Sequence, residues 1–284
     1  MPIDIDPYFS DSYLEAQYNN RQAVPDFADY LTDWSQRSEN YRAKTKGHLN
    51  LSYGESEREV LDIFPAATAS APIHIFLHGG YWQALSKDSF SFIAEPINQQ
   101  GECAIIVSYG LCPSVSIAEI ISQVQKAIRW ILSNGAEFGG DTRYIQITGH
   151  SAGAHLLAKL VTTNWAEDGF THPPFQRLNA LSGLYDLQPL VPTSINQALQ
   201  LTSQTSKQLS PLFDSLWHRS NSVELNLLVG GIESDEYKKQ SKQLIEAWRS
   251  ELSMQYQIIP GTHHFSILDR FYSDFYQPLT IVEK

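Results

Sequence analysis

The feature that most restricts the fold of this chain is the pattern Gly-His-Ser-Ala-Gly at residues 149–153. It follows an apolar run and precedes a segment with the apolar spacing of an amphipathic helix. This order is typical of a strand that turns sharply into a helix and holds the serine in a strained conformation, with its hydroxyl projecting into a cleft. The two glycines relieve the crowding of such a turn. The pattern therefore predicts a nucleophile elbow with Ser151 as the nucleophile.

A second motif lies upstream, where an apolar strand predicted at residues 73–77 leads directly into His-Gly-Gly-Tyr-Trp at residues 78–82. Loops of this type supply backbone N–H groups that bind a developing oxyanion, together with the N–H of the residue after the nucleophile. The predicted donors are Gly79 or Gly80 and Ala152. By themselves the two glycines could equally mark an ordinary turn after a strand, but the elbow downstream favours an oxyanion loop.

Short apolar segments alternate with helical patterns along most of the chain. Strands are predicted at residues 60–64, 73–77, 104–108, 144–148, 178–181, 225–229 and 256–259. The clearest helical pattern puts isoleucine, valine and alanine on one stripe between residues 117 and 131. This alternation predicts an α/β fold with a mostly parallel central sheet and helices on both faces. Because no polar linker divides the chain, we expect a single domain over residues 1–284.

Two segments depart from this alternation. Before Glu57, aromatic residues are spread among polar ones, which predicts an N-terminal helical extension over residues 1–56 packed against the sheet. Between residues 188 and 218, prolines are interspersed with leucine-rich turns. Insertions on this side of the sheet cover the active site in hydrolases, so we expect a small cap at 188–218. A plain surface excursion is the alternative.

Charge and composition disfavour several classes of function. Lys plus Arg total 20 against 31 Asp plus Glu, and the net charge of -11 argues against nucleic acid or an anionic membrane surface as a partner. The N-terminus lacks the features of a secretion signal, and no run of about 18 apolar residues occurs, so a soluble, cytoplasmic protein is expected. Two cysteines, Cys103 and Cys112, fit a reducing compartment, and their spacing does not demand a disulfide. No Cys or His cluster has zinc-site spacing, so no metal is implied.

A serine nucleophile needs an acid and a base, which follow it in the chain order serine, acid, histidine. After the strand predicted at 225–229 comes Gly-Gly-Ile-Glu-Ser-Asp-Glu at residues 230–236. Glu233 is the preferred acid because it lies closest to the end of the strand. Asp235 is the rival, although it could instead cap the following helix.

The loop after the last predicted strand contains two adjacent histidines. One of them should be the general base. His264 directly precedes the predicted final helix and is preferred over His263. His150 and His155, which lie on either side of the serine in sequence, are expected to be packing residues, because side chains beside an elbow serine diverge from it.

These motifs together resemble the kynurenine formamidase (arylformamidase) family of the α/β-hydrolase superfamily. The resemblance covers roughly Leu14 to the C-terminus. It is carried by residues 78–83 with 86–88, by 149–156, by Ser-Gly-Leu-Tyr-Asp-Leu at 182–187, by Glu-Ser at 233–234 and by the His-Phe pair near the end. It implies that Ser151 is the nucleophile, His264 the base and Glu233 the acid, where related sequences often carry aspartate.

The resemblance further implies hydrolysis of N-formyl-L-kynurenine to L-kynurenine and formate in tryptophan catabolism, without a cofactor. A broad-specificity carboxylesterase stays an alternative, because ester and amide hydrolysis use the same triad. The intact motifs argue against a non-catalytic binding protein. Tyr81, Trp82 and Phe265 flank the motifs and are candidate substrate-binding residues, although each could equally belong to the core. The expected partner is a small aromatic formamide or ester, and a homodimer is left open.

Overall fold

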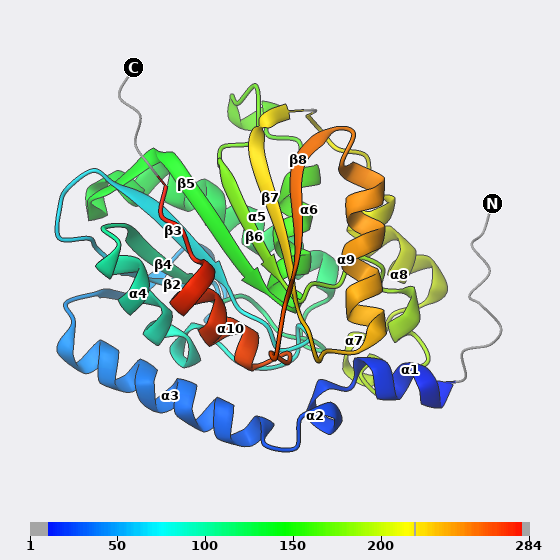
Figure 1. Cartoon of the computed structure of the whole chain (residues 1–284). Coiled ribbons are helices and arrows are strands. Elements are labelled where there is room, and N and C mark those ends of the chain that lie inside the picture. The colour runs from blue at the N-terminus through cyan, green and yellow to red at the C-terminus, as the bar shows by residue number, and fades with distance from the viewer. Residues whose placement is uncertain (1–10, 219, 280–284) are drawn as a thin grey trace.

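The centre of the fold is a mostly parallel, eight-stranded sheet, seen in a computed structural model that describes residues 11–218 and 220–279 (Figure 1). Across the sheet the strands follow the order β1-β2-β4-β3-β5-β6-β7-β8. Strand β2 is antiparallel to both of its neighbours. The other six strands after it in this order, β4, β3, β5, β6, β7 and β8, are parallel to one another. The strand bounds are β1 (His48–Ser52), β2 (Val60–Phe64), β3 (Ala71–Leu77), β4 (Cys103–Val107), β5 (Gly140–His150), β6 (Arg177–Leu181), β7 (Ser220–Gly230) and β8 (Leu252–Ile259).

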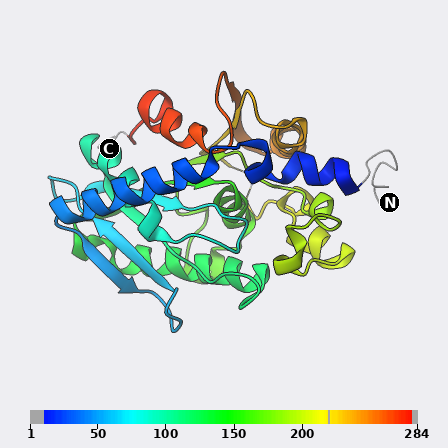
Figure 2. The same ribbon diagram turned by 90° about the horizontal axis from the view of Figure 1, so that it is seen from below.

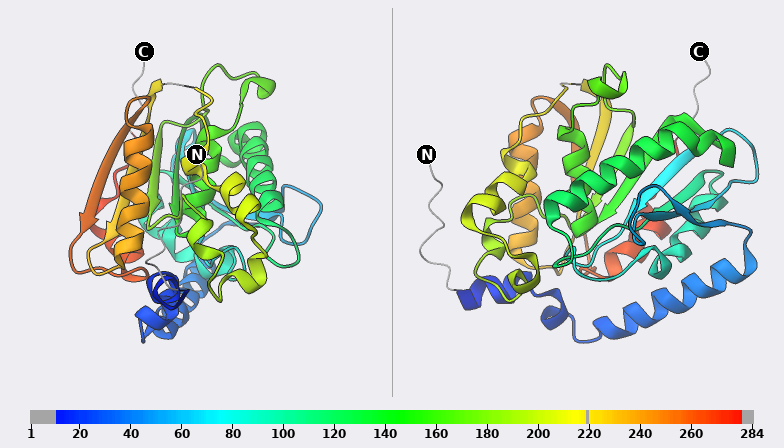
Figure 3. Two further views of the ribbon diagram at one scale, coloured as in Figure 1. Left: turned by 90° about the vertical axis from the view of Figure 1, so that its right-hand side faces the viewer. Right: turned by 180° about the vertical axis from the view of Figure 1, so that it is seen from behind.

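Helices cover both faces of this sheet, so the predicted α/β class is confirmed (Figure 3). On one face, α5, α6 and α9 pack over one apolar cluster, and the whole predicted stripe of α5 is buried there. On the other face, α3, α4 and α10 pack over a second cluster. The helix bounds are α1 (Asp11–Tyr18), α2 (Asn20–Ala23), α3 (Phe27–Lys44), α4 (Ala94–Gln99), α5 (Ile117–Asn134), α6 (Ala152–Thr162), α7 (Asn196–Leu199), α8 (Ser203–Leu209), α9 (Asp235–Trp248) and α10 (Ser266–Arg270).

Strand β3 shows why the middle of the sheet lacks a polar alternation. Successive side chains of a strand point to opposite faces. Ile75 therefore enters one apolar cluster and its neighbour Phe76 enters the other, and all seven residues of β3 are buried. A strand covered on both faces is therefore mostly apolar, and the one polar side chain of β3, His74, is hydrogen-bonded to Thr148.

The N-terminal segment lies across the edge at which the parallel strands end, and Figure 2 shows α1, α2 and α3 following one another along that edge. The first ten residues lie outside the described part of the chain. The predicted extension is not wholly helical, because residues 48–52 form β1, which pairs with β2. Most of β1 is exposed, so it carries little apolar pattern, and its backbone pairing is what the sequence could not reveal.

Residues 188–218 contain two short 3₁₀ turns besides α7 and α8, namely Gln188–Leu190 and Pro211–Phe213. This segment contacts the N-terminal helices, because Glu15 on α1 accepts hydrogen bonds from the amide and hydroxyl of Ser194 at 2.8 and 2.7 Å. A role as a cap stays a prediction. Within the described residues, no helix combines the length and apolar character that a membrane crossing requires.

Candidate active site

Ser151 lies alone in the turn between β5, which ends at His150, and α6, which begins at Ala152. Its backbone angles are φ 56° and ψ −116°, a sparsely populated combination for a residue with a side chain. The Ser151 amide donates to the carbonyl of Leu181 at the end of β6 over 2.8 Å, which fixes the turn against the neighbouring strand. The local geometry is thus that of the predicted elbow.

The two glycines of the motif are needed because of close backbone contacts. A Cβ atom at Gly149 would lie 2.4 Å from the carbonyl oxygen of Gly153, and one at Gly153 would lie 2.0 Å from that of Leu77. Real Cβ atoms do not approach so closely, so neither position accepts a side chain without movement of the backbone. Their absence of side chains lets the start of α6 pack directly against the end of β3.

The loop after β3 runs beside the nucleophile. A Cβ at Gly79 would lie 3.1 Å from the Cβ of Ser151, which places the Gly79 backbone in contact with the serine side chain. Gly80 has φ 111°, and both glycines line the same cavity as Ser151. Ala152 is the first residue of α6, and the first N–H groups of a helix have no acceptor within the helix. Gly79 and Gly80 therefore share the cavity with Ser151, and Ala152 follows it directly in the chain; their role as oxyanion donors stays a prediction.

Glu233 and His264 form a buried hydrogen-bonded pair. The Nδ1 atom of His264 donates to Oε2 of Glu233 over 2.8 Å. The other carboxylate oxygen accepts from Ser182 Oγ at 2.5 Å and from the Gly230 amide at 2.6 Å. These bonds fix the carboxylate, and the carboxylate in turn fixes the imidazole with its Nε2 on the opposite side of the ring. Such an arrangement leaves Nε2 as the atom that can accept a proton.

The two rival residues point elsewhere. Asp235 is the first residue of α9, its side chain is 90% exposed, and it pairs with Lys238 at 3.6 Å. His263 Nε2 lies 3.2 Å from the hydroxyl of Tyr30 on α3, while its Nδ1 accepts from amides at the start of α10. Of the two candidate pairs, the structure brings Glu233 and His264 together and leaves Asp235 and His263 apart.

The histidines on either side of Ser151 are both buried but differ in position. His155 packs in the core, where its Nε2 donates to the carbonyl of Leu209 over 2.8 Å. His150 lines the cavity, and its Nε2 donates to the backbone carbonyl of His264 over 2.8 Å. Burial lowers the pKa of each to about 3, so both rings stay neutral near pH 7. His150 therefore supports the loop of His264, a role beyond the packing that the sequence predicted.

The three candidate aromatic residues do not lie together. Tyr81 and Phe265 line the cavity that contains Ser151. Trp82 is fully buried and is not among the described residues that line it. Its ring packs edge-on against His155 with 4.9 Å between ring centroids. Tyr81 and Trp82 both have positive φ, and this tight loop sends their neighbouring side chains in different directions. The structure thus assigns Trp82 to the core rather than to a substrate slot.

No sequence pattern indicated Tyr237, which lies on α9 one helical turn beyond Glu233. It is fully buried, and its ring centroid is 4.9 Å from that of His264. Its hydroxyl accepts from Asn20 Nδ2 at 2.8 Å, lies 2.7 Å from the hydroxyl of Tyr81 and interacts with the Ser151 side chain. Burial raises the pKa of Tyr237, so its hydroxyl stays protonated and can donate a hydrogen bond. Ser151 therefore has a second hydroxyl beside its own.

The cavity has a volume of about 200 Å³, and its walls come from distant parts of the chain. The glycine loop after β3, the turn at Ser151 and the loop of His264 form one part. The rest comes from Ser194 and Ile195 and from the N-terminal segment, which contributes Asn19, Asn20, Arg21, Leu31 and Trp34. The motifs gave no sign of this N-terminal wall, because its residues follow no catalytic pattern.

Comparisons with known proteins identify similar chains. Residues 61–208 match the family model described as BD-FAE. The kynurenine formamidase of Salmo salar is 31% identical over 265 residues, 91% of this chain and 88% of the salmon protein. That of Danio rerio is 30% identical over 270 residues, 93% of this chain and 90% of its own length. A crystal structure from Silicibacter sp. TM1040, of a protein with a suggested thioesterase activity, has a TM-score of 0.79 and 29% identity, and covers 93% of this chain and 96% of its own.

Proposed function

The chain belongs to the kynurenine formamidase family of α/β-hydrolases, and from this premise we propose that it hydrolyses N-formyl-L-kynurenine to L-kynurenine and formate. The observation that carries the proposal is the hydrogen bond between Glu233 and His264, because His264 lines one cavity with the strained Ser151 and the glycine loop. Together these groups make up the parts of an acyl-transfer site: nucleophile, base, orienting acid and amide donors.

In the proposed reaction, the Nε2 atom of His264 takes the hydroxyl proton of Ser151 as the serine oxygen attacks the formyl carbon. The amides of Gly79 or Gly80 and Ala152 stabilise the tetrahedral oxyanion. Protonated His264 then gives its proton to the leaving arylamine, and the C–N bond breaks. Water, activated by the same histidine, attacks the formyl-serine ester and releases formate. Glu233 keeps the imidazole oriented and stabilises its positive charge in both halves of the reaction.

The cavity suits a substrate with one aromatic ring. Its volume of about 200 Å³ is small, and the side chains of Trp34, Tyr81 and Phe265 give it an aromatic lining. An aryl amine is also a better leaving group than an alkyl amine, since its lone pair delocalises into the ring. These features favour an aryl formamide, whose acyl group is the smallest available.

The second candidate is a carboxylesterase or thioesterase on the same triad, in keeping with the activity suggested for the Silicibacter neighbour. Steady-state rates separate the two. We expect kcat/KM for N-formyl-L-kynurenine to exceed that for its N-acetyl analogue and for p-nitrophenyl butyrate by at least about tenfold, or roughly 1.4 kcal/mol of transition-state binding. The Ser151→Ala variant controls for contaminating hydrolases. Equal or reversed preference would reject the formamidase and favour the esterase.

A further inference from the structure

The charge of the cavity wall is unlike the charge of the chain as a whole. The chain has a net charge of -11. Yet no aspartate, glutamate or lysine is found among the described residues that line the cavity. Among the described residues of this lining, Arg21 is the only one with a permanently charged side chain; the other ionisable side chains are two histidines and Tyr81, and burial raises the pKa of the tyrosine and so keeps it neutral. A cavity with a single, permanently cationic side chain favours a substrate that carries a negative charge.

Arg21 is held at the cavity by the short helix α2. The side chain of Asn19 caps this helix by accepting from the Gln22 amide, and its amide group donates to Glu15 at 2.7 Å. Asn20, the next residue, donates to the hydroxyl of Tyr237 at 2.8 Å and so ties α2 to the side of the nucleophile. The position of Arg21 is therefore fixed relative to Ser151 by hydrogen bonds on both of its preceding neighbours.

The guanidinium of Arg21 is available to a ligand. Across residues 11–218 and 220–279, no carboxylate pairs with it, whereas most of the other arginines described form ion pairs. Its central carbon lies 5.6 Å from the ring centroid of Phe27, and that ring packs against Phe265 in the cavity wall. Stacking on an aromatic ring orients a guanidinium while leaving its N–H groups free in the plane for a bidentate carboxylate.

We propose that Arg21 binds a carboxylate on the leaving-group side of the substrate, so that the preferred substrates are aryl formamides or aryl esters whose leaving group carries a carboxylate. The inference rests on the proposed hydrolysis at Ser151. The carboxylate has to be on the leaving group because a formyl group has no atom that could carry it. Arg21 is then a specificity residue that acts on substrate binding, at the opposite end of the substrate from the bond that breaks.

The test compares matched pairs of substrates that differ only in the carboxylate. One pair is N-formyl-L-kynurenine and its analogue with hydrogen in place of the carboxylate; the other is 4-carboxyphenyl acetate and phenyl acetate. The variants are Arg21→Gln, which removes the charge, and Arg21→Lys, which keeps it but loses the planar fork. Arg249→Gln removes an equal charge from an exposed position outside the cavity and is the control.

We expect Arg21→Gln to raise KM for the carboxylate member of each pair by roughly fivefold, as for a partly exposed charge-assisted contact. It should leave kcat little changed and should not raise KM for the member without the carboxylate. Arg21→Lys should recover part of the lost affinity, and added salt should reduce the preference of the wild type for the carboxylate member.

An equal rise in KM for both members of a pair, or no rise for the carboxylate member, would overturn the role of Arg21. If the wild type hydrolysed both esters but neither formamide, the formamidase function would be rejected. The ester pair would still decide the role of Arg21. Turnover of none of the four compounds would overturn both proposals.

Discussion

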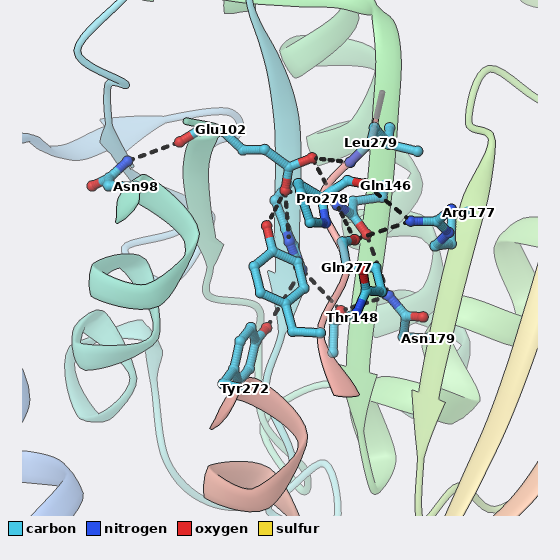
Figure 4. A network of polar contacts seen from close by, with 12 residues as sticks. Asn98, Glu102, Gln146, Thr148, Arg177, Asn179, Tyr272, Gln277, Pro278 and Leu279 are labelled. Carbon is cyan, nitrogen blue, oxygen red and sulfur yellow. Dashed lines mark hydrogen bonds and ion pairs between the residues drawn. The ribbon is translucent and has the colours of Figure 1, made fainter. Parts of the chain in front are cut away.

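Two sets of side chains, each with an acid, a histidine and a hydroxyl, are described in this molecule. They lie at different places on the sheet. At the strand ends, Glu233 pairs with His264 at 2.8 Å, and His264 lines the same cavity as Ser151. Under the C-terminal segment, Oε2 of Glu102 lies 3.4 Å from Nδ1 of His74, and Nε2 of the same ring lies 2.8 Å from the hydroxyl of Thr148 (Figure 4). The second set has the same chemical groups in the same order.

The second set is closed by the C-terminal segment. Glu102 accepts from the Tyr276 hydroxyl and from the Leu279 amide at 2.8 Å, and both oxygens accept from Gln146 at 2.7 Å (Figure 4). Arg177 donates to backbone carbonyls of the same segment. Burial raises the pKa of Glu102, but the bonds from His74, Tyr276 and Leu279 outweigh it, so the carboxyl has a lowered pKa. This carboxylate acts as an anchor for residues 276–279.

The difference teaches that an acid, a histidine and a hydroxyl do not by themselves make a catalytic site. Thr148 and Ser151 are three residues apart around the end of one strand, β5. Thr148 lies within the strand and faces buried polar side chains. Ser151 lies past the strand end at positive φ, where it lines a cavity. The turn at the strand end makes a hydroxyl reachable by substrate.

The largest expected contrast is between the two hydroxyls. Ser151→Ala should lower kcat by a factor on the order of 10⁵–10⁶, because it removes the nucleophile. Thr148→Val should leave kcat within about twofold and should lower the free energy of unfolding by roughly 1–2 kcal/mol, since a buried histidine loses a hydrogen-bond partner. Steady-state kinetics and urea unfolding of both variants measure this. A large loss of kcat in Thr148→Val would remove the distinction between the two regions.

The two carboxylates should show the next largest contrast. Glu233→Gln should lower kcat by about 10³–10⁴, because the imidazole loses its orienting charge. Glu102→Gln should keep kcat but lower the free energy of unfolding by about 2–3 kcal/mol, since several bonds to a charged acceptor are weakened. Asp235→Asn, at an exposed side chain close to Glu233 in sequence, is the control and should change neither quantity. If Asp235→Asn were the more damaging to kcat, the acid would have to be reassigned.

Acid should weaken the cavity side before the C-terminal anchor. Burial lowers the pKa of His78 to about 4 and that of His150 to about 3, whereas unfolded histidine has a pKa of about 6.5. Below pH 6.5 the unfolded chain therefore binds protons that the folded chain does not. Stability should fall by up to about 1.4 kcal/mol per pH unit for each histidine, until the folded pKa is reached. The lowered pKa of Glu102 makes the free energy of unfolding fall with pH only below the unfolded glutamate pKa of about 4.3.

Urea unfolding at pH 7.5, 5.5 and 4.0 checks this order. The wild type and Glu102→Gln should lose stability in parallel between the first two pH values, because the histidines are common to both. Below about pH 4.3 their stabilities should converge, since only the wild type still has the carboxylate contribution to lose. A wild-type stability that stays level between pH 7.5 and 5.5 would contradict the neutral state of the two buried histidines.

The smallest contrast concerns two tyrosines. Tyr237→Phe removes the hydroxyl beside Ser151 and should lower kcat by up to about tenfold, as expected for the loss of one neutral hydrogen bond at the site. Tyr276→Phe removes a hydroxyl on Glu102 and should affect only stability, by about 1–2 kcal/mol. The measurement compares, for each variant, the change in kcat with the change in the free energy of unfolding. Equal kinetic behaviour would show that Tyr237 has no part in turnover.

The apolar pattern of the sequence was sufficient to predict the positions of most strands of the sheet. All seven predicted strands occur within a residue or two of their predicted starts or inside longer strands. Five of them are buried parallel strands, which read as apolar runs; β2 is antiparallel and β8 is exposed or half-buried along most of its length. β1 was missed because an exposed edge strand is held by backbone pairing, which leaves no pattern in the side chains. The N-terminal helices were predicted, but their position over the strand ends was not.

The sequence by itself determined the alternation of strands and helices and the motifs next to the strand ends, since both depend on local chain geometry. Only the tertiary structure decided which of two neighbouring residues faces the site. It turned Tyr81 to the cavity and Trp82 to the core, and it put His264 rather than His263 on Glu233. It also brought Tyr237 beside Ser151, and Arg21 into the lining of the same cavity, from segments without any motif. The reason is physical: adjacent side chains in a loop diverge, and their direction is set by contacts with parts of the chain that are distant in sequence.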